Sequence, residues 1–104
     1  MKEGKVMADD IVVYGSNWCG YTIYCLRHLD KLGVPYRYVD VDQDAAAEKL
    51  IASWNKGRSI RPTVDLQGDV FVNPTARVME EELKKRGLMP STDASGGGEK
   101  AGER

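Results

Sequence analysis

The sequence predicts a single α/β domain, in which a mixed four-stranded sheet is covered by three helices in the order βαβαββα. Three observations lead to this fold class. The run at residues 11–14 is continuously apolar, which is typical of a strand covered on both faces. Stretches with helical spacing of apolar residues alternate with strand-like segments. Two further short strands flank Gly68, as expected for a β-hairpin.

The first helix is predicted at residues 20–32, directly after a strand at about 11–15. Gly33 ends it, and Pro35 two residues later is a common stop signal. The face of this helix that points to the core is expected to consist of Cys25, Leu29 and Leu32, at positions i, i+4 and i+7.

The remaining elements are bounded by capping and turn residues. They are predicted as a strand at 36–41, a helix at 45–55, strands at 63–66 and 70–72, and a last helix that begins after Thr75 and ends by Gly87. Residues 42–44 supply candidate N-caps for the second helix, and the loop 67–69 uses Gly68 for a positive φ. The inner face of the second helix is expected to hold Ala46, Leu50, Ile51 and Trp54.

Composition divides the 104 residues into three parts. Residues 1–9 are polar and are expected to form a flexible N-terminal segment. Residues 10–89 are expected to form the folded domain. Residues 90–104 carry too little apolar surface to fold, so we expect a disordered C-terminal tail.

Charge and hydropathy exclude several classes of function. The formal net charge is −1, which leaves no surplus of basic surface for nucleic acid. No run approaches the roughly 18 apolar residues of a membrane span, and residues 1–6 have no apolar segment of a secretory signal. We therefore expect a cytoplasmic monomer that binds neither nucleic acid nor membrane.

Cys19 stands at the junction between the first strand and the first helix. A helix N-terminus carries about half a positive charge, which favours thiolate and lowers a cysteine pKa from about 8.5 into the range of about 3.5–7.5. Trp18 and Tyr21 would shield a partly exposed sulfur, while Gly20 lets a substrate approach the backbone. The alternative is a buried, inert cysteine. These neighbours favour the reactive thiolate.

The order of motifs around this cysteine is characteristic. A strand is followed by Trp-Cys-Gly-Tyr at residues 18–21, by a helix, and about forty residues later by Arg-Pro-Thr-Val at residues 61–64. This pattern resembles the glutaredoxin family of the thioredoxin-like fold, in particular the mycoredoxin-like branch, whose active site reads Trp-Cys-Gly-Tyr-Cys. Residues 10–89 would then form a glutaredoxin-like domain. The fifth position here is Thr22, so the usual resolving thiol is missing.

The second cysteine, Cys25, lies six residues beyond Cys19. A helical rise of about 1.5 Å per residue separates the two Cα atoms by roughly 9 Å, whereas a disulfide needs about 4.4–6.8 Å. We therefore interpret Cys25 as a buried structural residue, the alternative being a resolving thiol that acts after a conformational change. The only histidine, His28, is too far along the helix to act as a base and is placed on the helix surface.

The resemblance implies a thiol–disulfide oxidoreductase that acts by a monothiol mechanism, with Cys19 as nucleophile. Its substrates would be mixed disulfides between proteins and a low-molecular-weight thiol, either glutathione or mycothiol, and it would need no covalently bound cofactor. Besides Cys19, the residues expected to bind the thiol substrate are Trp18, Tyr21, Thr22, Lys56, Arg58, Arg61, Pro62 and Thr75.

Individual roles follow for several of these residues. The resemblance implies that Pro62 has a cis peptide bond and faces Cys19. The Arg61 guanidinium would favour the thiolate and attract substrate carboxylates, while its peptide group pairs with an extended substrate backbone. Lys56 or Arg58 would reach a terminal carboxylate. Thr22 cannot resolve a mixed disulfide, but its hydroxyl can donate a hydrogen bond to the sulfur.

Two other functions stay open. Some monothiol glutaredoxins hold an iron–sulfur cluster between two protomers, with one protein cysteine and one glutathione from each side. Cys19 would supply that thiolate, although the large Tyr21 and the absence of a Cys-Gly-Phe-Ser signature argue against it; no other metal site is predicted. A thioredoxin-fold adaptor without catalysis is the third hypothesis, and an intact Cys19 counts against it.

Overall fold

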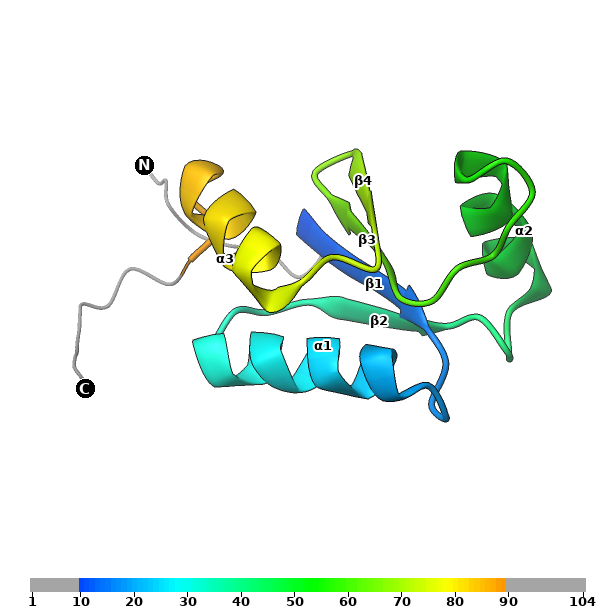
Figure 1. Cartoon of the computed structure of the whole chain (residues 1–104), viewed down its shortest axis with the longest axis horizontal. Helices are drawn as coiled ribbons and strands as arrows, with labels where there is room; N and C mark the ends of the chain where they lie inside the picture. Colours follow the sequence, from blue (N-terminus) through cyan, green and yellow to red (C-terminus); the bar gives the residue numbers. More distant parts are fainter. Residues whose placement is uncertain (1–9, 90–104) are drawn as a thin grey trace.

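The computed structural model describes residues 10–89 (Figure 1). The two segments predicted to be flexible, residues 1–9 and 90–104, lie outside the described residues. The elements are β1 (Ile11–Gly15), α1 (Gly20–Leu32), β2 (Arg37–Asp40), α2 (Ala45–Trp54), β3 (Thr63–Leu66), β4 (Asp69–Val72) and α3 (Ala76–Lys85). This order is the predicted βαβαββα, and the thioredoxin-like fold class is confirmed.

The four strands form one mixed sheet in the order β2-β1-β3-β4. β1 runs parallel to β2 and antiparallel to β3, with Val13 opposite both Tyr38 and Val64. β3 and β4 form the predicted antiparallel hairpin. Because β1 is an inner strand with residues 11–13 fully or almost fully buried, its continuous apolar run is explained.

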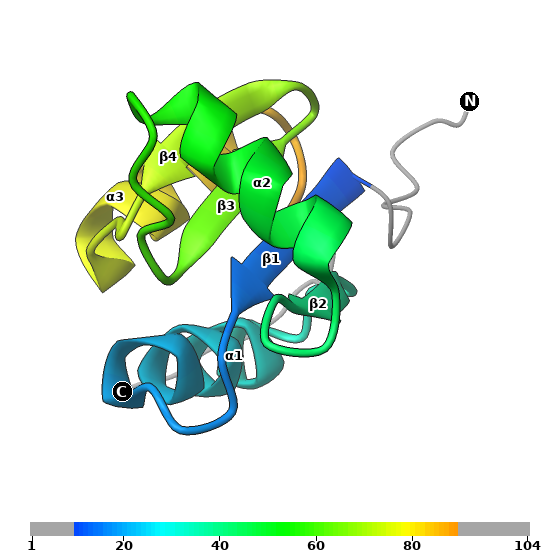
Figure 2. The ribbon, with the colours of Figure 1, turned by 90° about the vertical axis from the view of Figure 1, so that its right-hand side faces the viewer.

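The two faces of the sheet carry different helices. On one face, α1 and α3 contribute Cys25, Leu29, Met79 and Leu83 to the larger hydrophobic core, together with Ile11 and Val13 of β1. On the other face, Ala47 and Ile51 of α2 pack with Val41. Figure 2 shows α2 lying in front of β1. Helices cover both faces, so the accessible part of this end of the sheet is the loop that leads into α1, where Asn17 and Trp18 are exposed.

The buried face of α2 differs from the predicted one. Ala47 and Ile51 are buried, whereas Leu50 is 41% exposed and Ala46 is exposed. Trp54 is partly buried and packs edge-to-face on Tyr14, with ring centroids 5.6 Å apart. The face that meets the sheet therefore consists of Ala47, Ile51 and Trp54, at positions i, i+4 and i+7. The predicted inner positions Ile51 and Trp54 are confirmed, whereas Ala46 and Leu50 were wrong.

The hairpin turn is tighter than predicted. β4 begins at Asp69, so only Gln67 and Gly68 connect the strands, and both have positive φ values of 54° and 98°. This is the geometry of a two-residue type I′ turn, whose twist matches that of the strands. The Asp65 side chain supports the turn by accepting a hydrogen bond from the Gly68 N–H at 2.7 Å.

No helix within residues 10–89 is long and apolar enough to cross a membrane.

Candidate active site

Cys19 is the N-cap residue of α1. The loop that follows β1 leads directly into this helix (Figure 1). Its backbone is extended, with φ −84° and ψ 119°, and its N–H donates to the Ser16 carbonyl at 3.1 Å. The sulfur is a free thiol, and the residue is half-buried. The N-cap position places this sulfur beside the first N–H groups of the helix, which have no partner within the helix.

The surroundings of Cys19 lower the pKa of its thiol. Partial burial raises the pKa, but the backbone N–H and hydroxyl of Thr22, the backbone N–H of Tyr21 and the charge of Arg61 together outweigh it. None of these N–H groups reaches the geometry of a capping hydrogen bond. They act as oriented dipoles that favour the thiolate.

Thr22 lies fully buried in the first turn of α1. Its hydroxyl oxygen accepts a hydrogen bond from the Ser16 N–H at 3.4 Å. Gly15 makes this placement possible, because a Cβ there would lie 2.4 Å from Thr22 Cγ2 and 2.5 Å from its Oγ1. Thr22 is thus fixed between the end of β1 and Cys19, at the position where the Trp-Cys-Gly-Tyr-Cys motif has its second cysteine.

The loop before β3 faces the sulfur. The Arg61–Pro62 peptide bond is cis, as predicted. The Cys19 thiol donates to the Arg61 carbonyl oxygen over 3.9 Å, a long contact of the kind a weak S–H donor makes. The Pro62 carbonyl accepts from the Asn73 N–H at 2.7 Å, which ties this loop to the end of β4. The structure therefore brings Cys19, Thr22, Arg61 and Pro62 together.

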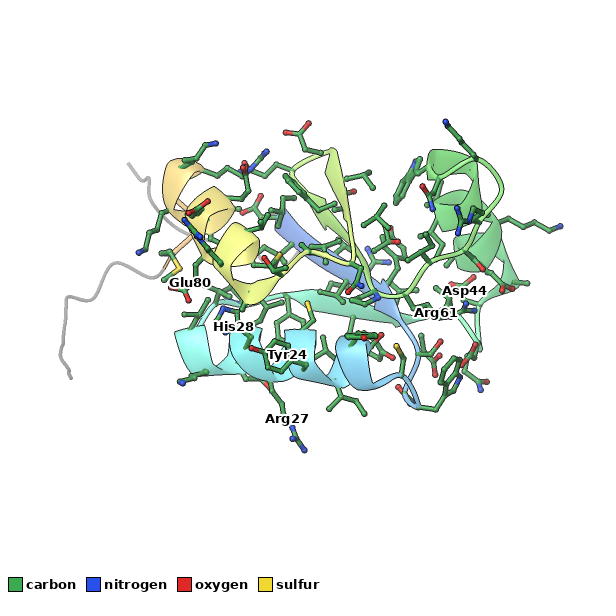
Figure 3. The ribbon with its side chains drawn as sticks, in the orientation of Figure 1. Tyr24, Arg27, His28, Asp44, Arg61 and Glu80 are labelled. Carbon is green, nitrogen blue, oxygen red and sulfur yellow. The ribbon has the colours of Figure 1, made fainter. Side chains whose placement is uncertain are left out.

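The Arg61 side chain is engaged by this chain's own carboxylates. The terminal nitrogen Nη2 lies 3.3 Å from Asp42 Oδ1 and 3.1 Å from Glu48 Oε2, and Nη1 donates to the Ser59 carbonyl at 3.0 Å. The side chain is only 16% exposed, and Figure 3 shows it toward the α2 end of the molecule. Sequence reasoning treated this guanidinium as available to substrate carboxylates and missed both acidic partners.

The two aromatic residues of the motif are mostly exposed, Trp18 to 72% and Tyr21 to 69%. The Trp18 indole N–H donates to Asp42 Oδ2 at 2.7 Å. Asp42 therefore holds Trp18 with one oxygen and Arg61 with the other. Sequence reasoning had considered Asp42 only as a helix cap, a role that Asp44 fills by accepting from the Ala47 N–H at 3.0 Å.

The remaining predicted binding residues come from the loop between α2 and β3 and from the start of α3. Lys56 and Arg58 are exposed in the loop between α2 and β3, and neither forms an ion pair with another described residue. Thr75 is the N-cap of α3, where its hydroxyl accepts from the Val78 N–H at 3.2 Å. None of the three has a direct contact with Cys19 among the described hydrogen bonds and ion pairs.

Cys25 is buried, and burial raises the pKa of its thiol to about 11. It lies at the wall of a cavity of about 630 Å³ between α1 and the start of α3, which sequence reasoning missed; other lining residues are Tyr21, Tyr24, His28, Pro74 and Met79. His28 is not on the free surface of α1, since its side chain is only 15% exposed and its Nε2 lies 3.5 Å from Glu80 Oε1 (Figure 3).

These two thiols are expected to differ in the pH dependence of alkylation. Iodoacetamide reacts with thiolates, so the rate at Cys19 rises with pH to a plateau whose midpoint lies below that of an ordinary cysteine. Cys25 reacts with a midpoint near its pKa of about 11, or after unfolding. Peptide mapping of partly alkylated protein at several pH values measures both. Equal labelling of the two cysteines at pH 7 would contradict this assignment.

Comparison with known proteins gives the family. The glutaredoxin family model matches residues 11–72. Mycoredoxin 1 of Corynebacterium glutamicum is 38% identical over 69 residues, covering 65% of this chain and 85% of the relative. A Mycobacterium tuberculosis protein that carries the name glutaredoxin is 30% identical over 76 residues, covering 72% of this chain and 90% of the relative.

A solved structure confirms the fold independently. The crystal structure of the glutaredoxin from Methanosarcina mazei superposes with a TM-score of 0.64 at 23% sequence identity, covering 75% of this chain and 81% of that one. The match of residues 11–72 spans β1 to β4 and therefore includes Cys19 and the cis-proline loop. The chain belongs to the glutaredoxin family of thiol–disulfide oxidoreductases and is mycoredoxin-like.

Proposed function

We propose that this glutaredoxin reduces mixed disulfides between proteins and a low-molecular-weight thiol, with Cys19 as its single reacting cysteine. One observation carries the proposal: beside a thiol whose pKa is lowered, the position of a resolving cysteine is filled by the buried Thr22. The other cysteine, Cys25, has a pKa raised to about 11 and is buried. A single thiolate therefore has to complete the cycle with an external thiol.

The first step is a disulfide exchange. The Cys19 thiolate attacks the sulfur of the small thiol in the mixed disulfide, so a bond forms between Cys19 and that sulfur while the old disulfide bond breaks. The protein thiolate leaves and takes up a proton from solvent. The Thr22 hydroxyl stabilises the Cys19 thiolate before attack without being able to displace it from the new disulfide.

The second step needs another molecule of the small thiol. Its thiolate attacks the small-thiol sulfur bound to Cys19, which releases the Cys19 thiolate and forms the symmetric small-molecule disulfide. Each turnover thus consumes one free small thiol and converts the mixed disulfide into a protein thiol and the symmetric small-molecule disulfide, so atoms and electrons balance. Glutathione or mycothiol is the expected co-substrate, since either supplies the required thiol.

The substrate would lie across the loop at Pro62. An extended substrate backbone pairs with the peptide group of Arg61, whose carbonyl already lies 3.9 Å from the sulfur. Tyr21 and Thr75 flank the small thiol from α1 and the start of α3, while the exposed Lys56 and Arg58 offer positive charge that no other residue within 10–89 pairs. These roles follow the placement expected for the family.

The mass of the intact protein tests the proposal. After exposure of the reduced chain to glutathione disulfide or to bis(2-hydroxyethyl) disulfide, we expect one small thiol per chain, mapped to Cys19 and stable on standing. Thr22→Cys is the matched variant, since it restores a resolving thiol in the first helical turn. The final mass of this variant should show no adduct and should be two hydrogens lower than that of its reduced form. The introduced thiol displaces the small thiol from Cys19 and forms a disulfide with it.

Three results would speak against the single-cysteine scheme. Loss of two hydrogens in the unmodified chain would show that Cys25 reaches Cys19. The absence of an adduct with both reagents would favour an adaptor without catalysis. Visible absorbance after anaerobic reconstitution with iron, sulfide and glutathione would instead indicate an iron–sulfur cluster held by Cys19.

A further inference from the structure

Two carboxylates surround the one guanidinium that lies beside the candidate active site. Asp42 and Glu48 lie 3.3 Å and 3.1 Å from the same Arg61 nitrogen, and the Arg61 side chain is only 16% exposed. Two negative charges thus oppose one positive charge. The Asp42 and Glu48 side chains are 33% and 46% exposed, so solvent screens both pairs in part while the Arg61 side of each pair is shielded.

Two contacts link the cluster of Asp42, Glu48 and Arg61 to Cys19 and its neighbour Trp18. The Arg61 carbonyl lies 3.9 Å from Cys19 Sγ. Asp42 also accepts from the indole N–H of Trp18, the residue before Cys19, at 2.7 Å. Burial raises the pKa of the nearby Tyr38 hydroxyl, and Asp40, Asp42 and the Cys19 thiolate raise it further, so Asp42 and Cys19 act on the same ring.

A substrate carboxylate would meet this cluster at a disadvantage. To bind Arg61 it has to displace Asp42 or Glu48, both of which already hold the guanidinium with charge-assisted hydrogen bonds. If it does not displace them, it experiences a cluster whose summed charge is negative. Uncharged and cationic groups suffer neither cost.

We propose that Asp42 and Glu48 are specificity-determining residues, which disfavour reaction of Cys19 with carboxylate-bearing disulfides relative to uncharged or cationic ones. The inference rests on the proposed function, since it requires Cys19 to react with small disulfides. Lys56 and Arg58 carry positive charge on the neighbouring loop and also influence how fast anionic disulfides react. The effect of Asp42 and Glu48 is therefore measured as the change in relative rates when each is replaced.

The test compares three symmetric disulfides that differ in charge: 3,3′-dithiodipropionate, bis(2-hydroxyethyl) disulfide and cystamine. In each reaction the Cys19 thiolate attacks one sulfur, forms the mixed disulfide and releases one small thiolate. Mass spectrometry of quenched samples gives second-order rate constants for the intact chain. Ratios between variants cancel the intrinsic differences among the three reagents.

Glu48→Gln is the principal variant, because glutamine keeps the size and one acceptor oxygen while removing the charge. We expect the ratio of the anionic to the neutral rate constant to rise about three- to tenfold, and the cationic to neutral ratio to fall. Asp42→Asn should act in the same direction. Both effects should shrink at 1 M salt, where the Debye length is about 3 Å.

Glu81→Gln serves as the matched control. Glu81 is exposed on α3 and, among the residues that the structure describes, pairs only with Arg77 at 3.3 Å, so the same change in net charge is made away from the site. Its ratios should equal those of the unmodified chain. Unchanged ratios in both Glu48→Gln and Asp42→Asn would overturn the inference, provided that the neutral disulfide still reacts.

The neutral reagent separates failure of the inference from failure of the proposed function. A retained rate with bis(2-hydroxyethyl) disulfide shows that the variant is folded and that Cys19 is intact. If the unmodified chain reacts with none of the three disulfides, the proposed function fails, and this inference fails with it.

Discussion

Replacing Cys19 with serine is expected to reduce turnover of a glutathionylated peptide at least about a thousandfold, because a hydroxyl at neutral pH is neither ionised nor a nucleophile toward disulfide sulfur. Replacing Cys25 with serine should leave turnover within about threefold of the unmodified chain. The difference follows from their environments, since the pKa of Cys19 is lowered whereas that of Cys25 is raised to about 11. Both rates are measured at a saturating concentration of the small thiol. Chromatography detects the free peptide thiol as it is released.

The two cysteine variants need different controls. Cys25 is buried, so a serine hydroxyl there costs about 1–3 kcal/mol if it finds no partner. Cys25→Ala avoids that cost, and thermal melting identifies any variant that is partly unfolded at the assay temperature. A Cys19→Ser chain that turns over as fast as the unmodified one would refute the scheme. A large loss in both Cys25 variants, with melting unchanged, would assign Cys25 a chemical role.

The elements that the sequence predicts most accurately are those fixed by local signals. The bounds of α1, Gly20–Leu32, agree because the N-cap at Cys19, the left-handed Gly33 with φ 74° and Pro35 all lie within the segment itself. The N-cap of α3 at Thr75 agrees for the same reason. The cis bond at Pro62 was reached through resemblance rather than through local physics.

The parts that could not be predicted depend on contacts between distant residues. Asp42 was interpreted only as a candidate helix cap and Glu48 was given no role, and nothing in their local sequence indicates that Arg61 would reach them across 19 and 13 residues. His28 lies on a polar-looking stretch of α1, yet α3 covers it. On the inner face of α2, Ile51 and Trp54 were predicted correctly. Ala46 was predicted in place of Ala47 because the alanines at residues 45–47 offer no contrast in hydrophobicity.

Gly15→Ala is expected to lower the free energy of unfolding by about 3 kcal/mol, which corresponds to a fall in Tm of roughly 12–24 °C for a domain of this size. The new methyl group would lie 2.4–3.0 Å from three atoms of the Thr22 side chain, which is fully buried and has no room to move away. The backbone is equally fixed, because Gly15 pairs with Asp40 and its carbonyl accepts from the Val41 N–H at 2.9 Å. Thermal and urea unfolding of the variant measure the change.

Gly20→Ala is the matched control, since a Cβ at that helical position meets nothing within 4 Å. Alanine is the better helix former, so this variant should be unchanged or up to about 1 kcal/mol more stable. In the double variant Gly15→Ala/Thr22→Ala, two of the three clashing atoms are removed, and its stability should exceed the sum of the single effects. Two results would show that the Thr22 side chain does not require glycine at position 15. One is a similar loss of unfolding free energy in Gly15→Ala and Gly20→Ala, and the other is strict additivity of the Gly15→Ala and Thr22→Ala effects. Coupling of the two sites would establish that the end of β1 holds Thr22 in place, and with it the hydroxyl that lowers the pKa of the Cys19 thiol.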